Sequence, residues 1–95
     1  PLGVLAAVTR AVEDLLGEVE GPVAVLVPER YAVPLAGLEA SHDRVRVMDP
    51  LSSKGLEWDG VVVVDPDRIV REAAGGIRTL YVALTRAAHR LTVLT

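Results

Sequence analysis

The sequence predicts an α/β fold of three layers, in which helices cover both faces of a parallel β-sheet. Short apolar runs of strand length alternate along the 95 residues with segments of helical periodicity, a pattern typical of right-handed β-α-β units. Half of the residues are apolar (51%), but with one Trp, two Tyr and no Phe the core must be aliphatic. A chain of this length buries roughly 60–68% of its unfolded surface, enough for one small domain.

Four elements are predicted in the first half of the chain. Apolar residues at helical spacing predict a helix over residues 2–16. Residues 23–27 form a continuous apolar run, typical of a strand that is buried on both faces. A short helix is expected over residues 31–38, where Pro34 limits its length. Polar and apolar residues alternate over residues 44–48, which predicts a strand exposed on one face.

The second half continues the alternation of strands and helices. Residues 61–64 are all valine and predict a second strand buried on both faces. A short helix is expected over residues 67–72, and two glycines separate it from a longer helix over residues 77–89. Residues 91–94 supply the last strand.

The burial expected of each strand predicts its place in the sheet, because fully apolar strands should be central and alternating ones should flank them. The predicted spatial order is 44–48, 23–27, 61–64 and 91–94. In open α/β sheets, ligands collect beyond the carboxyl ends of the strands, where the winding reverses. We expect this edge to be formed by residues 28–30, 49–57 and 65–67.

Composition excludes several classes of protein. A net charge of −3 argues against a general nucleic-acid-binding protein, although residues 51–95 carry six basic and five acidic groups. The absence of Cys excludes disulfides and thiolate metal sites, and the two His have no partner at metal-ligand spacing. The longest apolar runs are about five residues, so we expect no contact with a membrane and a cytoplasmic location. Because the chain begins with Pro, we expect a fragment of a longer protein.

The turn ahead of the 61–64 strand carries the first group of candidate site residues. Lys54 is the only lysine of the chain and follows Ser52 and Ser53. Exposed amides at the start of a helical turn attract anions or ribose oxygens, and Gly55 permits a close backbone approach. Glu57 is an acceptor suited to ribose hydroxyls or to an arginine. The alternative is an ordinary capped turn with polar surface residues.

The predicted helix over residues 77–89 carries the second candidate. The residues that share its sheet-facing side are Ile77, Leu80, Tyr81, Leu84 and Ala88. On this interpretation Tyr81 belongs to the core and is not a base-stacking platform. Arg86 points away beside the apolar Val82 and Ala83, which indicates a surface that another domain covers. The alternative is a solvated arginine on a polar face.

Together these two segments resemble the last two signature motifs of the UvrD/Rep family of superfamily 1 DNA helicases. Residues 47–59 are similar to the motif Thr-x-His-x-x-Lys-Gly-Leu-Glu-Phe, and residues 80–87, Leu-Tyr-Val-Ala-Leu-Thr-Arg-Ala, match the final motif nearly letter for letter. The resemblance implies that residues 22–95 form the second RecA-like motor domain of an ATP-dependent helicase or translocase, preceded by an N-terminal helix and linker over residues 1–21. The predicted partners are the first RecA-like domain of the same protein and single-stranded DNA.

The resemblance also implies roles for individual residues. Arg86 matches the arginine that reaches the γ-phosphate of ATP from across the cleft between the two motor domains. Glu57 matches the glutamate near the ribose, with Gly55 beside it, and Arg30 corresponds more loosely to an earlier phosphate-contacting arginine. Residues 52–54 match the stretch that couples the motif to nucleic acid.

The chain departs from the family pattern at Asp49-Pro50-Leu51, which replaces the Thr-x-His that touches single-stranded DNA in the family. Asp49 would repel phosphate. The Asp-Pro pairs before the motif and at residues 65–66 resemble the HelD-type branch, whose members act on bacterial RNA polymerase. The alternative function is therefore a polymerase-interacting ATPase domain that does not separate strands.

The chain lacks the parts that would hydrolyse ATP by itself. It has no Gly-x-x-x-x-Gly-Lys-Ser/Thr loop and no acidic pair for Mg²⁺, so the magnesium ligands are expected on the first motor domain. We expect this fragment alone to be inactive. A third hypothesis, a free-standing flavodoxin-like binding module with chance motifs, keeps the same fold class.

Overall fold

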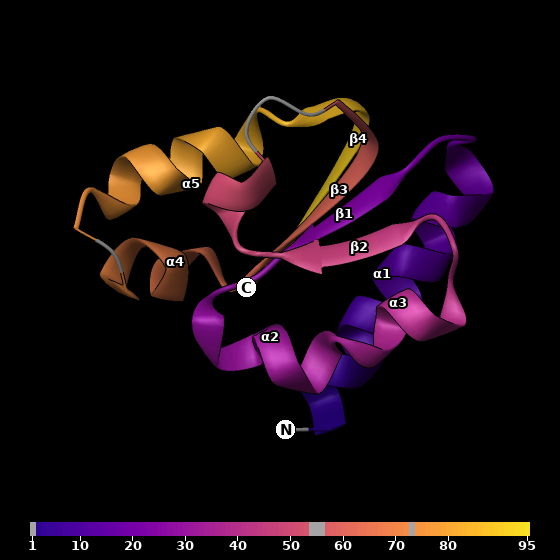
Figure 1. Ribbon diagram of the computed structural model, residues 1–95, viewed down its shortest axis with the longest axis horizontal. Coiled ribbons are helices and arrows are strands. Elements are labelled where there is room, and N and C mark those ends of the chain that lie inside the picture. The colour runs from indigo at the N-terminus through magenta and orange to yellow at the C-terminus, as the bar shows by residue number, and fades with distance from the viewer. Residues whose placement is uncertain (1, 54–56, 73) are drawn as a thin grey trace.

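The computed structural model, which describes residues 2–53, 57–72 and 74–95, is an α/β fold built on one four-stranded parallel sheet (Figure 1). The strands are β1 (Val23–Leu26), β2 (Val45–Met48), β3 (Trp58–Val64) and β4 (Ala87–Leu94). Their order across the sheet is β2-β1-β3-β4. The predicted fold class and strand order are therefore confirmed, and the architecture is consistent with a RecA-like domain.

Helices cover both faces of this sheet (Figure 1). They are α1 (Leu2–Glu18), α2 (Glu29–Leu35), α3 (Gly37–Ser41), the 3₁₀ helix η1 (Pro50–Ser53), α4 (Pro66–Glu72) and α5 (Gly76–Leu84). Helices α1, α2 and α3 pack on one face, whereas α4 and α5 pack on the other. The single helix expected over residues 31–38 is thus two short helices, α2 and α3. Among the described residues, no helix is long and apolar enough to cross a membrane.

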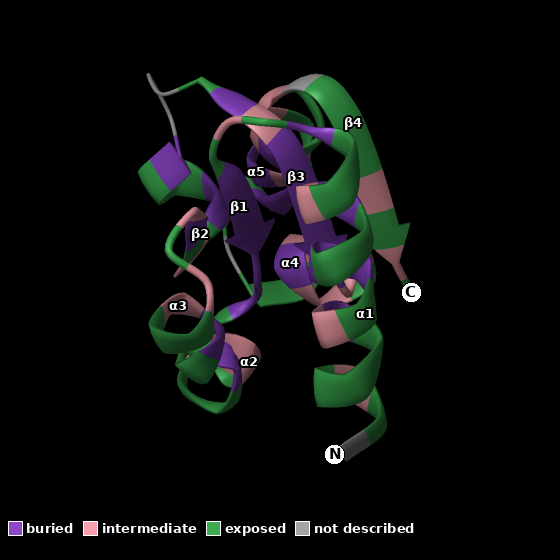
Figure 2. Ribbon diagram, turned by 90° about the vertical axis from the view of Figure 1, so that its right-hand side faces the viewer, coloured by how far each residue is buried: buried purple, intermediate pink, exposed green. Residues whose placement is uncertain are grey.

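The two central strands hold the core together because each contributes buried side chains to both faces. All four residues of β1 are buried, and so are six of the seven residues of β3 (Figure 2). On the first face, Val25 and Val62 pack with Val12 and Leu15 of α1. Helix α1 therefore belongs to the same core as the sheet. The edge strand β4 is mostly exposed or half-buried, as expected of a flanking strand, but its apolar Leu91 and Val93 are exposed (Figure 2).

The second face carries a smaller core. Leu26, Val61 and Val63 of the central strands pack there with Ile69 of α4 and Ala83 of α5. Helix α4 begins at Pro66, where the preceding Asp65 has a positive φ of 51° and its backbone N–H donates to Leu94 O at 2.8 Å. This hydrogen bond connects the carboxyl end of β3 to the carboxyl end of β4.

The helix predicted over residues 77–89 is wrong in its length. Helix α5 ends at Leu84, and residues 87–94 form β4. The Thr85 hydroxyl donates to the carbonyl oxygens of Tyr81 (2.9 Å) and Val82 (3.2 Å), which satisfies acceptors that the helix end leaves open. From Ala87 on, pairing with β3 supplies the backbone hydrogen bonds. Long-range strand pairing has overridden the helical periodicity of residues 86–89.

The predicted orientation of this helix is also wrong. Ile77 (76% exposed) and Tyr81 (69% exposed) face outward, whereas Thr79 and Ala83 are buried. Tyr81 therefore does not belong to the core, contrary to the prediction. The small residues Gly76, Thr79 and Ala83 lie where α5 meets its neighbours, and they allow a close approach that larger side chains would prevent.

A glycine substitution tests this close packing. A Cβ atom at Gly76 would collide with the backbone carbonyl of Val70 in α4. We expect Gly76→Ala to lower the free energy of unfolding by about 1–3 kcal/mol, the cost typical of overpacking a filled site. At Gly17 in α1 a Cβ meets nothing within 4 Å, so Gly17→Ala should stabilise the protein by about 0.5–1 kcal/mol. Urea unfolding midpoints measure both changes, and equal effects of the two variants would contradict the packing described here.

Candidate functional site

The segment between β2 and β3 begins at the carboxyl end of the sheet and finishes at its amino end. It leaves the carboxyl end of β2 at Asp49, passes through η1 and enters the amino end of β3 at Trp58. Glu57 therefore lies at the amino end of the sheet, and not at the carboxyl edge where the sequence placed it. The expectation was wrong because it treated residues 49–57 as one compact turn. Lys54 and Gly55 lie outside the described residues.

Strand register brings Glu57 and Arg86 to the same place. Trp58 of β3 pairs with Ala87 of β4 in a parallel arrangement, so the residues immediately before them are also neighbours across the two strands. Between this pair and the next, Gly60 with Arg90, β4 contains one more residue than β3, which is a β-bulge. Two residues that are far apart in the sequence thus lie immediately before the amino ends of adjacent strands.

The guanidinium group of Arg86 retains unused hydrogen-bonding capacity. Its Nε atom is buried and has no acceptor among the described residues, while Nη2 makes one long contact of 3.5 Å to the Thr85 hydroxyl. Arg86 as a whole is half-buried. A guanidinium carries five N–H donors, and leaving a buried one without an acceptor is costly. The Nη donors of Arg86, which make only this one long contact among the described residues, are therefore suited to an anionic group that arrives from outside this domain.

A cavity of about 420 Å³ lies at the same end of the sheet, lined by residues that precede β1, β2 and β3 as well as by the strands themselves. Arg44, Arg46 and Glu57 line it together with Trp58. The Trp58 ring is 6% exposed, and its Nε1–H donor is buried without an acceptor in the described part of the chain. Trp58, which begins β3, and Arg86, which immediately precedes β4, thus each have a buried N–H donor without an acceptor among the described residues, as does Arg68 in α4.

The two arginines of this cavity have different tasks. The Arg44 guanidinium donates to Leu16 O at 2.7 Å and to Val19 O at 3.0 Å, the carbonyls at the end of α1. These carbonyls have no partner within the helix, so Arg44 acts as its cap. Arg46 is exposed and contacts only the nearby backbone carbonyls of residues 43 and 45. Only Arg46 can turn toward a ligand without a loss of structure.

The other predicted site residues lie elsewhere. Arg30 is exposed on α2, which follows the carboxyl end of β1, so the length of the sheet separates it from Glu57 and Arg86. Ser52 is exposed and its hydroxyl donates to Asp49 Oδ1 at 2.5 Å. Ser53 is fully buried, and its hydroxyl donates to Pro50 O at 2.5 Å. Both serines therefore stabilise η1.

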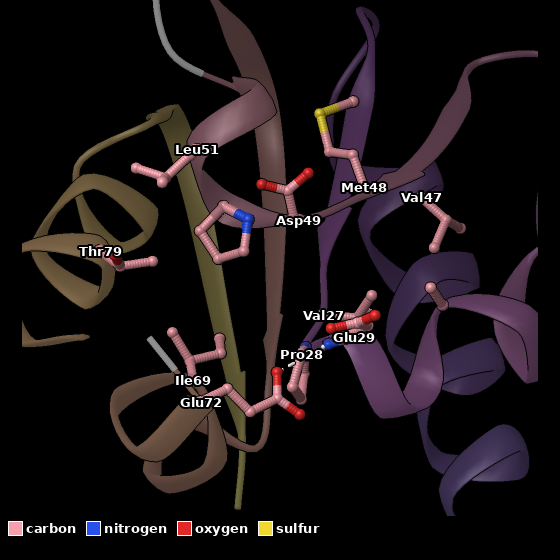
Figure 3. A pocket seen from close by; sticks show the side chains of 12 residues that line it. Val27, Pro28, Glu29, Val47, Met48, Asp49, Leu51, Ile69, Glu72 and Thr79 are labelled. Carbon is pink, nitrogen blue, oxygen red and sulfur yellow. Dashed lines mark hydrogen bonds between the residues drawn. The ribbon is translucent and has the colours of Figure 1, made fainter. Parts of the chain in front are cut away.

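A larger cavity of about 640 Å³ occupies the carboxyl edge, where sequence reasoning expected the ligand (Figure 3). It lies between α2 on one side and α4 and α5 on the other, beyond the ends of β1 and β2. Three carboxylates line it, from Glu29, Asp49 and Glu72, and no basic side chain among the described residues does. The sequence analysis placed residues 28–30 at this edge but missed Glu72, because only the fold brings α2 and α4 together.

The two ends of the sheet therefore differ in chemistry. The amino end offers an arginine with unused donors beside a glutamate, a combination suited to a phosphate and its ribose. The cavity at the carboxyl end is lined by carboxylates, which repel phosphate, whereas Arg30 and Arg68 lie at this end outside its lining. No group of three or more potential metal ligands lies close together within residues 2–53, 57–72 and 74–95.

Comparison with known proteins identifies one family. The family model described as the UvrD-like helicase C-terminal domain matches residues 45–94, which include β2, β3, α4, α5 and β4. The matched region contains Glu57 and Arg86 and excludes Arg30. No curated protein matches the chain at a significant level.

The different tasks of the two arginines can be measured. We expect Arg44→Met to lower the free energy of unfolding by about 1–3 kcal/mol, since it removes two charge-assisted hydrogen bonds to otherwise unpaired carbonyls. Arg46→Met, the matched control in the same strand, should change it by less than about 0.5 kcal/mol. Thermal or urea unfolding of both variants provides the comparison, and equal losses would show that Arg44 does not cap α1.

Proposed function

The chain belongs to the family of UvrD-like helicase C-terminal domains, and on this basis we propose that it completes an ATP site whose other half is held by a first motor domain. In this proposal the intact protein is an ATP-dependent helicase or translocase. Its ATP binds mainly to the first RecA-like domain, and the amino end of the present sheet closes over the nucleotide. The observation that carries the proposal is the position of Arg86 beside Glu57 at that end.

In the proposed site, Arg86 neutralises the charge that develops on the γ-phosphoryl group during transfer. Its Nη groups make only one long hydrogen bond among the described residues, so they are the donors that an incoming phosphate would meet. An arginine in this role contributes roughly 10³–10⁵ in rate, or about 4–7 kcal/mol of barrier. The exposed Glu57 would accept hydrogen bonds from the ribose hydroxyls. Gly55 is proposed to lie beside the nucleotide, and Lys54 is proposed to contact the nucleic acid. Both residues lie outside the described residues.

The cofactor of the proposed reaction is ATP with Mg²⁺. Because the sequence contains neither a phosphate-binding Gly-Lys-Ser/Thr loop nor the acidic pair that positions the metal, these parts must come from the first motor domain. Within the described residues, Glu57 and Arg86 fit the ribose and the terminal phosphate. Arg30 lies at the opposite end of the sheet. Arg30 could contact a phosphate only if the nucleotide also reached the carboxyl end of the sheet. We therefore assign the nucleotide to Glu57 and Arg86.

Substitution of Arg86 in the full-length protein tests this function. We expect Arg86→Ala to lower kcat for ATP hydrolysis at least a thousandfold, because the transition state loses its charge stabilisation. Arg86→Lys should restore little of this activity, since lysine lacks the planar fork of donors. A steady-state phosphate-release assay measures both rates.

The control variant is Arg71→Ala, which removes an exposed arginine from α4 and should leave hydrolysis within about twofold of the starting protein. Both alanine variants should unfold at similar urea concentrations. If Arg86→Ala keeps its turnover, then Arg86 does not act on the phosphate, and the proposed role in catalysis is wrong.

A second candidate function is favoured by the acidic cavity at the carboxyl edge. The family motif contacts single-stranded DNA through the residues that are Asp49-Pro50-Leu51 here, and Asp49 lies in a cavity with two further carboxylates. This environment favours the HelD-like alternative, in which ATP hydrolysis drives a rearrangement of RNA polymerase and not strand separation. Unwinding of a tailed duplex by the full-length protein supports the first candidate. Co-purification with RNA polymerase and no unwinding support the second.

Substitution of Asp49 tests whether the carboxylates at this edge weaken the binding of single-stranded DNA. We expect Asp49→Asn in the full-length protein to strengthen binding of a labelled single-stranded oligonucleotide by about two- to fivefold at low salt, because one repelling charge is lost. The asparagine oxygen can accept from the Ser52 N–H while its NH2 group donates to the Ser52 hydroxyl, so η1 should stay folded. Fluorescence anisotropy measures the Kd, with Asp14→Asn on α1 as a control of equal charge change. Unchanged or weaker binding by Asp49→Asn would show that DNA does not approach this loop.

A further inference from the structure

The carboxyl-edge cavity combines an apolar wall with an acidic rim. Its apolar side chains come from strands, helices and η1, and include Val47, Met48, Leu51 and Ile69 (Figure 3). Leu51 is half exposed at the opening. The volume of about 640 Å³ lies within the range of roughly 300–1,000 Å³ that is typical of ligand pockets. This cavity has no role in the nucleotide site proposed at the opposite end of the sheet.

The carboxylates of the rim are held in place by uncharged donors. Glu72 Oε1 accepts a hydrogen bond from the backbone N–H of Glu29 at 2.9 Å, and Asp49 accepts from the N–H and hydroxyl of Ser52. The ion pairs among the described residues involve other acidic groups, namely those of Glu13, Glu18 and Asp65. The three rim carboxylates therefore have oxygens that no cation neutralises within the described part of the chain.

Like charges around one cavity repel one another, and a cation placed between them removes that repulsion. An anion such as a phosphate group meets the opposite situation and is disfavoured. A bare metal ion does not fit either, because no group of potential ligands converges within the described residues and much of the wall is apolar. The chemistry that matches both features is a cationic head on an apolar stem.

We propose that this cavity is a docking site for a segment of a partner protein that carries an arginine or lysine between apolar residues. The aliphatic stem would lie along Met48 and Ile69, while the charged head reaches the carboxylates of Asp49 and Glu72. Long basic side chains bind in this way, with the stem buried and the charge at the edge. Arginine fits best, because its planar fork donates to two carboxylate oxygens at once. The apolar neighbours of the basic residue would contact Leu51 at the opening.

Binding of a model peptide to the chain of residues 1–95 tests the proposal. The probe is a short fluorescein-labelled peptide in which leucine and arginine alternate, and fluorescence anisotropy gives its Kd. The rim variant Glu29→Gln/Asp49→Asn/Glu72→Gln removes the negative charges but keeps the acceptors that hold Glu29 N–H and Ser52. We expect the Kd of this variant to be at least about tenfold higher, as the loss of several partly exposed ion pairs predicts.

The matched control is Glu13→Gln/Asp14→Asn/Glu20→Gln, which removes the same net charge from exposed positions on α1 and just after it. Its Kd should stay within about twofold of the starting protein. Equal losses in the two triple variants would show a general attraction of a basic peptide to an acidic protein and would overturn the proposal. A peptide with serine in place of leucine should bind at least about fivefold more weakly, since the apolar wall is then unused; equal affinity would also overturn it.

A second measurement needs no substitution. In NMR spectra of the unmodified chain, the leucine–arginine peptide should shift the backbone amide signals of Val47, Asp49 and Thr79, which line the cavity. Signals of Trp58 and Ala87, at the amino ends of β3 and β4, should stay in place. Shifts confined to the amino end would contradict the proposed site. Displacement of the peptide from the cavity by a single-stranded oligonucleotide would identify the site as one for nucleic acid and overturn the proposal.

Discussion

The pairing of β3 with β4 is the interaction on which the functional geometry depends. The register of Trp58 with Ala87 places Glu57 beside Arg86, although 28 intervening residues separate them in the sequence. At the opposite end, the hydrogen bond from Asp65 N–H to Leu94 O fixes the same two strands. The bulge in β4 adds one residue near the first pair and so sets which side chains meet there. A shift of one residue would turn every side chain of β4 to the other face.

This pairing also decides where α5 ends. Residues 77–89 have a continuous helical periodicity, but β4 requires an extended chain from Ala87. The hydroxyl of Thr85 completes the last helical turn, and Arg86 then occupies the last position before the strand. An arginine at this junction is attached to two rigid elements. Such an attachment limits its motion and suits a residue that must meet a ligand held by another domain.

The two ends of the sheet differ in how their charged side chains are arranged. At the amino end, the guanidinium of Arg86 makes only one long hydrogen bond through Nη2 among the described residues, so its remaining Nη donors are suited to an anion. At the carboxyl end, Glu29, Asp49 and Glu72 surround an apolar cavity, so this end is suited to a cation. The net charge of −3 conceals this division because it sums over both ends. Only the positions of the charges distinguish a domain that binds nucleotide from one that also binds a basic protein segment.

The sequence by itself determined the α/β class, the strand order and the motif that contains Arg86, because strand burial and short-range periodicity are local properties. It did not determine which face of α5 is buried. That face is set by the close contact of Gly76 with Val70 and by the fit of Thr79 and Ala83 against neighbouring elements, which are long-range packing effects. The neighbourhood of Glu57 and Arg86 and the acidic cavity between α2 and α4 were likewise decided by tertiary structure, since residues distant along the chain meet only when the strands pair.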